Sequence, residues 1–113
     1  MKVAQSAMLS PQLAKAAEDL GTLLARLRLA RGMKQQEAAL RAGISRNSAY
    51  RLERGDPGLA IGQILRYLEA LAPGKTLLEL LSQADPALIT LGVQEKKRRV
   101  RDMTRAELDD LDF

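Results

Sequence analysis

The chain has 113 residues, of which 46% are hydrophobic, carries a formal net charge of +4, and contains neither cysteine nor histidine. This length fits one globular domain, and the composition rules out disulfides, zinc clusters, thiol nucleophiles and histidine-based acid–base catalysis. No carboxylates are paired beside an apolar pattern that could line a pocket, so we expect no enzyme activity, no catalytic residue, no metal and no cofactor.

The positive charge is concentrated in the middle of the chain, where residues 20–72 hold nine basic and four acidic side chains. A basic domain attracts phosphates without sequence preference. No stretch approaches the roughly 20 apolar residues of a membrane span, and residues 1–20 lack the apolar core of a signal peptide. We therefore expect a cytoplasmic protein with no membrane partner.

The N-terminal segment is predicted to be helical. Ser10 can cap a helix and Pro11 fits its first turn, which predicts a helix in an N-terminal extension of residues 1–19. A second apolar periodicity predicts another helix over residues 20–31. Because only Gly21 interrupts the pattern, the two helices can also run together.

Two short helices are predicted next, between residues 35 and 55. The first ends at Gly43, since glycine enters the left-handed conformation without strain, and Ser45 can cap the second by accepting a backbone N–H. Small apolar faces allow the two helices to pack closely. These faces consist of Ala38, Ala39 and Ala42 on the first helix and Ala49 and Leu52 on the second. This is the layout of a helix-turn-helix.

The outer face of the second short helix is polar. At 100° per residue, its long polar side chains fall within an arc of about 140°, opposite Ala49 and Leu52. They belong to Arg46, Asn47, Tyr50 and Arg51. Arginine can donate two hydrogen bonds to guanine and asparagine can bond adenine, so this face suits base reading in the major groove. A solvated helix face is the alternative, and the flanking residues favour DNA.

The segment from about residue 20 to residue 71 resembles the lambda-repressor-like helix-turn-helix family, the phage repressor and Cro type that includes the XRE regulators. The start of the family's motif is matched by Gln35, Glu37, Ala39, Ala42 and Gly43. Its end is matched by Ser45, Arg46, Ala49, Leu52, Glu53, Arg54 and Gly55. Departures from the pattern occur at Met33, Lys34 and Ala38, which affect packing. The resemblance implies an all-α, five-helix domain at residues 20–83 that binds double-stranded DNA, with helical extensions on both sides.

The resemblance also assigns roles to single residues. It makes Arg46, Asn47 and Arg51 the residues that contact bases. Contacts with the DNA backbone fall on Gln35, Ser45, Ser48, Tyr50 and Gln63. The family pairs an arginine of its first helix with the glutamate before the final Arg-Gly, which here joins Arg28 to Glu53. The alternative for Arg28 is one more exposed basic side chain.

Two further helices are predicted after a turn at residues 56–58. The first begins at Ile61 or Gly62 and stops at Pro73. Its core-facing residues are Ile64, Leu65, Leu68 and Leu71. Thr76 caps the second, whose leucines offer more apolar surface than one core contact needs, so we expect a dimer seam there. The seam residues are Leu77, Leu78, Leu80 and Leu81.

The C-terminal extension, residues 84–113, gives weaker signals. Residues 87–93 can form a strand or a helix interrupted by Gly92, and we favour the helix. The basic run 96–101 fits either a solvated helix flank or an arm that contacts phosphates. Thr104 and Glu107 form a capping-box pattern, which predicts a short final helix from about Arg105 to Leu111. The apolar, acidic tail that ends at Phe113 either binds a protein or folds back on its own leucines.

Two functions fit these observations. The first is a homodimeric transcriptional repressor that binds a palindromic operator. The second is an antitoxin of a toxin–antitoxin operon, similar to HipB-like and HigA-like members of the family, which binds a toxin protein and represses its own promoter. The resemblance does not separate the two.

Overall fold

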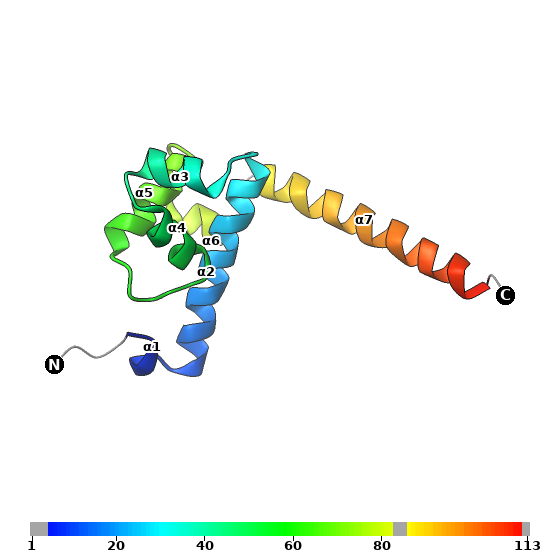
Figure 1. The fold of residues 1–113 in the computed structure, drawn as a ribbon, viewed down its shortest axis with the longest axis horizontal. Helices are drawn as coiled ribbons and strands as arrows, with labels where there is room; N and C mark the ends of the chain where they lie inside the picture. Colours follow the sequence, from blue (N-terminus) through cyan, green and yellow to red (C-terminus); the bar gives the residue numbers. More distant parts are fainter. Residues whose placement is uncertain (1–4, 83–85, 112–113) are drawn as a thin grey trace.

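A computed structural model describes residues 5–82 and 86–111 as helices joined by short turns. The helices are α1 (Gln5–Met8), α2 (Pro11–Ala30), α3 (Gln35–Ala42), α4 (Arg46–Glu53), α5 (Ile61–Leu71), α6 (Leu77–Leu81) and α7 (Pro86–Leu111). In Figure 1, α3, α4, α5 and α6 gather on one side of α2, and α7 extends away from them. The prediction of an all-α fold is confirmed, and none of the described helices is long and apolar enough to cross a membrane.

The two predicted N-terminal helices form one helix, α2. Ser10 caps it, with its Oγ accepting the N–H of Leu13 at 3.2 Å, and Pro11 occupies the first position. The helix runs past residue 19, where the sequence suggested a boundary between an extension and the domain. It ends before Gly32, whose φ of 68° leaves the helix in the left-handed region.

A close approach between α2 and the end of α4 explains why a glycine lies inside α2. A Cβ at Gly21 would lie 2.6 Å from the backbone nitrogen of Gly55 and 2.7 Å from the backbone oxygen of Leu52. In the other direction, a Cβ at Gly55, which has φ 79°, would lie 2.5 Å from the Cα of Glu18. Glycine at both positions therefore lets the end of α4 lie directly against the backbone of α2.

The core lies between α2, α3, α4 and α5. Leu24 and Leu27 of α2 and Leu68 of α5 are buried in it. All five apolar residues predicted to join α3 and α4, four of them alanines, are buried as well: Ala38, Ala39, Ala42, Ala49 and Leu52. Small side chains at this contact allow α3 and α4 to pack closely, which sets the geometry of the helix-turn-helix.

The predicted core face of α5 is partly wrong. Leu68 and Leu71 are buried and Ile64 packs against the core, but Leu65 is 45% exposed. Tyr67 is buried instead. At 100° per residue, position 65 lies farther from the centre of the apolar stripe than position 67 does, so the helix turns the tyrosine inward.

The predicted dimer seam on α6 also needs correction. Thr76 caps α6 as expected, with its Oγ1 accepting the N–H of Glu79 at 3.2 Å. Leu80, however, is only 3% exposed and belongs to the core, and Leu77 packs against that core. Only Leu78 and Leu81 of the four seam residues are exposed, because a one-and-a-half-turn helix lying on the core must turn one face inward.

The C-terminal segment differs most from expectation. Residues 87–93 are helical, as favoured, but the separate helix expected from Arg105 to Leu111 is part of the continuous α7. Thr104 therefore lies inside a helix and not at the start of one; the stretch before it contains no proline or glycine after Gly92 that would end the helix. Leu88 is buried in the core, which thus extends beyond α6. Phe113 lies outside the described residues.

Candidate nucleic-acid interface

The turn between α3 and α4 has the geometry that the sequence predicts. Gly43 has φ 69° and ψ 31°, and the N–H of Ile44 donates to the carbonyl of Ala39 at 3.1 Å, which closes the end of α3. Ser45 then caps α4, with its Oγ accepting the N–H of Ser48 at 3.0 Å. These local bonds fix the direction in which α4 leaves the turn.

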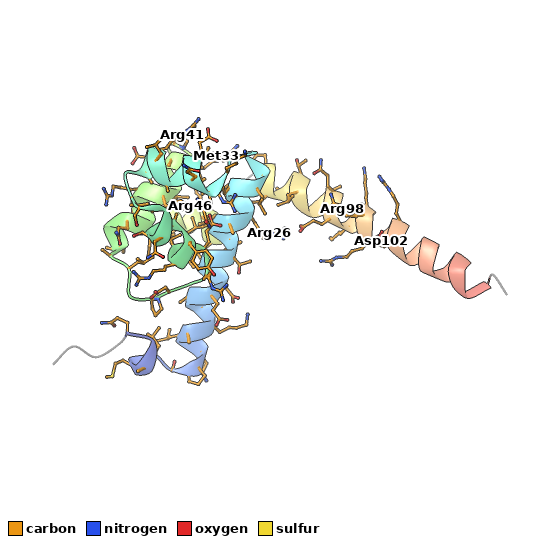
Figure 2. The ribbon with its side chains drawn as sticks, in the orientation of Figure 1. Arg26, Met33, Arg41, Arg46, Arg98 and Asp102 are labelled. Atoms are coloured by element: carbon orange, nitrogen blue, oxygen red, sulfur yellow. The ribbon has the colours of Figure 1, made fainter. Side chains whose placement is uncertain are left out.

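Arg46 and Asn47 occupy the first turn of α4 and are exposed. Within residues 5–82 and 86–111, neither side chain takes part in a hydrogen bond or an ion pair. In Figure 2, Arg46 lies among the helices on the side of α2 opposite to α7. The donors of both side chains are therefore available to a ligand that approaches α4 from solvent.

Arg51 is held by a residue that sequence reasoning did not single out. Its Nε donates to Oδ2 of Asp56 at 2.7 Å, while Oδ1 of the same carboxylate accepts the N–H of Gly58 at 2.8 Å. The hydrogen bond from the Arg51 guanidinium lowers the pKa of Asp56 below its ordinary value, and the hydrogen bond from the Gly58 N–H lowers it further by a smaller amount. The bond uses Nε and leaves the terminal nitrogens of Arg51 as donors. The signal was present in the turn Asp56-Pro57-Gly58, because aspartate at such a position is often bonded to the turn backbone.

Tyr50 is paired with Arg54 one turn later. Nη1 of Arg54 donates to the tyrosine hydroxyl at 3.1 Å, and the guanidinium carbon lies 5.4 Å from the centroid of the ring. This places a second cation beside Arg51 on the exposed side of α4. The spacing of four residues on a helix could have revealed the pair in the sequence.

The remaining residues expected at the DNA backbone lie at helix starts. Gln35 is the first residue of α3, and Oγ of Ser48 accepts a 2.9 Å hydrogen bond from the hydroxyl of Ser45. Gln63 accepts the N–H of Ala60 through Oε1 at 3.2 Å, which leaves its amide NH₂ as a donor. Side chains at helix N-termini suit phosphate contacts because the helix ends carry partial positive charge.

Behind the exposed face, a network of three largely buried side chains joins α2, α4 and α5. Arg28 donates to Glu53 from Nε at 2.7 Å and from Nη2 at 3.0 Å, and these side chains are 15% and 7% exposed. Tyr67 donates its hydroxyl proton to the same carboxylate. Burial raises the pKa of Tyr67, and the hydrogen bond to Glu53 raises it further by a smaller amount. The structure thus brings Arg28 and Glu53 together, and the tyrosine is an addition that the sequence analysis did not foresee.

In a comparison with protein-family models, residues 19–81 match a model described as a helix-turn-helix domain. The chain belongs to this helix-turn-helix family. The match covers α3 and α4 together with the helices that support them, and it agrees with the lambda-repressor-like resemblance. Comparisons with curated proteins and with solved structures returned no match.

The helix-turn-helix domain is of a kind that binds DNA, and its exposed second helix is the element that such domains place in the major groove. Among the described residues, no group of histidine, cysteine, aspartate or glutamate side chains could hold a metal ion. The chemistry of this surface consists of hydrogen-bond donors and positive charge on α4 and at the start of α3.

Proposed function

We propose that this protein is a transcriptional repressor that binds a specific sequence of double-stranded DNA as a homodimer on a palindromic operator. The observation that carries the proposal is the first turn of α4, where Arg46 and Asn47 are exposed beside a capped helix end. Their donors match acceptors in the major groove: guanine O6 and N7 for arginine, adenine N7 for asparagine.

Arg51 is the third base-contacting residue in this proposal. Its bond to Asp56 through Nε restricts the rotation of the guanidinium before DNA arrives. A planar donor group that is already oriented loses less conformational freedom when it bonds a base. Asp56 is therefore a positioning residue, which acts on DNA only through Arg51.

Backbone contacts come from the residues around this helix. Gln35, Ser45, Ser48, Tyr50 and Gln63 supply hydroxyl and amide donors that fit phosphate oxygens. Such contacts hold the domain in register on the duplex and raise affinity for every sequence, whereas base contacts decide which sequence binds best.

The test begins with selection of a binding site from a random duplex library, followed by titration of the selected and a scrambled duplex. Arg46→Ala should weaken binding of the selected duplex by about 1–3 kcal/mol and leave binding of the scrambled duplex nearly unchanged. Arg66→Ala is the matched control, because it removes an exposed arginine from α5 and so lowers the charge equally. Equal losses on both duplexes for Arg46→Ala would show that this side chain does not read a base.

Repression and two-fold symmetry are tested with the same site. The selected sequence should be an inverted repeat, since two identical subunits related by a two-fold axis read identical half-sites in opposite directions. Placing the site over a promoter should lower transcription when the protein is present. A selected site without an inverted repeat would contradict the homodimer.

A further inference from the structure

Helix α7 carries a run of basic residues just beyond the point where it leaves the domain. The helix is anchored before this run, because Leu88 is buried in the core and Glu95 accepts a hydrogen bond from Nη1 of Arg26 at 3.0 Å. The basic run follows directly and consists of Lys96, Lys97, Arg98, Arg99 and Arg101. It therefore starts at a fixed place on α2 and extends away from it.

The five basic side chains of this run are all exposed. In the part of the chain that the structure describes, none of them takes part in a hydrogen bond or an ion pair. Glu95 is the one carboxylate among residues 86–101, and it is already bonded to Arg26. Figure 2 shows Arg98 on the part of α7 that lies beyond the other helices. The run is therefore a concentration of positive charge that is open to a ligand.

Three of the five cations lie on one face of α7. At 100° per residue, Lys96, Lys97 and Arg101 fall within an arc of about 140°. Leu88 and Glu95, which contact the rest of the domain, lie on the opposite side of the helix. We call the face with the three cations the outer face of the run, since it points away from α2.

The outer face contains a shallow groove. Its lining residues are Val93, Lys96, Lys97, Val100 and Arg101. The two lysines lie between the two valines along the helix, so a membrane or an apolar helix seated there would have to bury their charges, which is unfavourable. A ligand with several negative charges instead matches the cations without burying them.

The acidic residues near the C-terminus are too far along the helix to neutralise the run. They begin at Glu107, six residues beyond Arg101, which corresponds to about 9 Å along the axis of α7. Charges in physiological salt are screened over about 8 Å. A polyanion that crosses α7 at the basic run therefore avoids the acidic end of the helix.

We propose that the outer face of the run contacts phosphates of duplex DNA outside the half-site that α4 contacts. The proposal rests on the DNA binding proposed above and adds a second contact surface to it. In Figure 1, α4 and the start of α7 lie at different places along the long axis of the molecule, which measures 64 Å against 32 and 25 Å for the other two. A duplex parallel to the long axis passes α4 first and the basic run next.

An acidic protein is the other polyanion that fits these charges. DNA is favoured because the chain belongs to a helix-turn-helix family that binds DNA, so a duplex already lies against the same molecule. Duplex DNA carries about one negative charge per 1.7 Å of its length and therefore offers several phosphates to the three cations. The two ligands predict different effects of the same substitutions.

The salt dependence of binding to two duplexes tests the contact. The short duplex holds only the selected site, and the long duplex adds random sequence on both sides. The full-length wild type should bind the long duplex more tightly, with a steeper fall of log affinity against log salt. The variant K96Q/K97Q/R101Q should lower this slope by about 2–3 per subunit on the long duplex alone, because each phosphate contact contributes about 0.9. Glutamine preserves the helix, since its helix propensity is close to that of lysine and arginine.

The variant K15Q/R66Q/K75Q is the matched control, because it removes three exposed cations from other parts of the chain. It should keep the wild-type difference in slope between the long and the short duplex. The proposal is overturned if K96Q/K97Q/R101Q also keeps that difference, or if the control loses as much of it.

A scrambled long duplex and sedimentation separate this contact from the other possibilities. Phosphate contacts do not depend on sequence, so the length effect should also appear on scrambled DNA. Equal binding of selected and scrambled duplexes with the length effect intact would contradict only the proposed base reading. Weaker self-association of K96Q/K97Q/R101Q without DNA, together with an unchanged length effect, would show that the run binds protein and would overturn the proposal.

Directed cleavage locates the contact on the duplex, because the natural chain contains no cysteine. An iron chelate attached to Gln94→Cys, an exposed position just before the run, should cut the long duplex outside the selected site. The same chelate on Gln36→Cys, at the start of α3, should cut within the site. Cleavage from Gln94→Cys that falls only within the site, or no cleavage from it, would overturn the proposal.

Discussion

The helix-turn-helix unit and helix α7 are held to α2 by different means. The backbone of α2 at Gly21 lies directly against the backbone at Gly55, which follows α4. A largely buried ion pair also joins Arg28 of α2 to Glu53 of α4. Against α7, α2 forms a partly exposed ion pair between Arg26 and Glu95. The difference indicates that α4 is fixed rigidly in the domain, which the proposed base contacts require, while most of residues 89–102 of α7 are exposed.

The largest expected effect concerns the glycine contact. Gly21→Ala should destabilise the protein by about 3–5 kcal/mol, because the new methyl group meets backbone atoms that cannot move aside. Thermal or urea unfolding would measure it. Gly92→Ala is the matched control: it is also a helical glycine, but nothing lies within 4 Å of its added Cβ. This control should be neutral or stabilising by up to about 1 kcal/mol, and equal effects of the two variants would contradict the contact.

The second prediction concerns the buried pair. Arg28→Met should destabilise the fold by about 3 kcal/mol, because Glu53 would remain buried without its cation. The double variant R28M/E53Q should be less destabilised than the sum of its two single variants, by about 1–3 kcal/mol in a double-mutant cycle. Additive effects would show that the two side chains do not stabilise each other.

The same cycle on Arg26 and Glu95 gives a smaller expected value. Their shortest N–O distance is 2.5 Å, but the two side chains are 33% and 35% exposed, so water screens the pair. A coupling of less than about 1 kcal/mol is expected. A coupling equal to that of the buried pair would remove the distinction between the two regions.

The smallest expected effect concerns pH. Because Arg51 lowers the pKa of Asp56 in the folded protein, the stability that this carboxylate contributes is present above its unfolded pKa and is lost as pH falls through the lower folded pKa. Asp56→Asn should therefore reduce the slope of stability against pH in the acid range, with Asp19→Asn as an exposed control. An NMR titration that finds Asp56 at or above 3.8 would contradict the ion pair.

The sequence predicted the parts of this structure that depend on local signals. Gly43 and Ser45 define the turn by backbone conformation and capping, and the polar face of α4 follows from helical spacing alone. The pairing of Arg28 with Glu53 came from the family resemblance, because the two residues lie far apart in sequence. The base-reading roles of Arg46 and Asn47 stay predictions.

The missed features depend on tertiary packing. Gly21 looked like a potential helix break, and only the approach of α4 gives it a structural role. The buried Leu80 looked like interface because a sequence pattern cannot show which of several leucines meets the core. Tyr67 was missed because its hydroxyl needs Glu53, and that acceptor comes from another helix.

The central claim is that Arg46 and Asn47 read individual bases from the rigid platform of α2, α3 and α5. The most direct test measures whether each variant still distinguishes the base that its missing side chain would contact. The wild type, Arg46→Ala and Asn47→Ala are each titrated against the selected site and against every single base-pair substitution in one half-site. We predict that substitution of a contacted base pair costs the wild type about 1–3 kcal/mol of binding free energy. Each variant should no longer distinguish the bases at one such position and should still distinguish them at all the others. A uniform loss across all positions would contradict the claim, because it would show that these side chains contact only the DNA backbone.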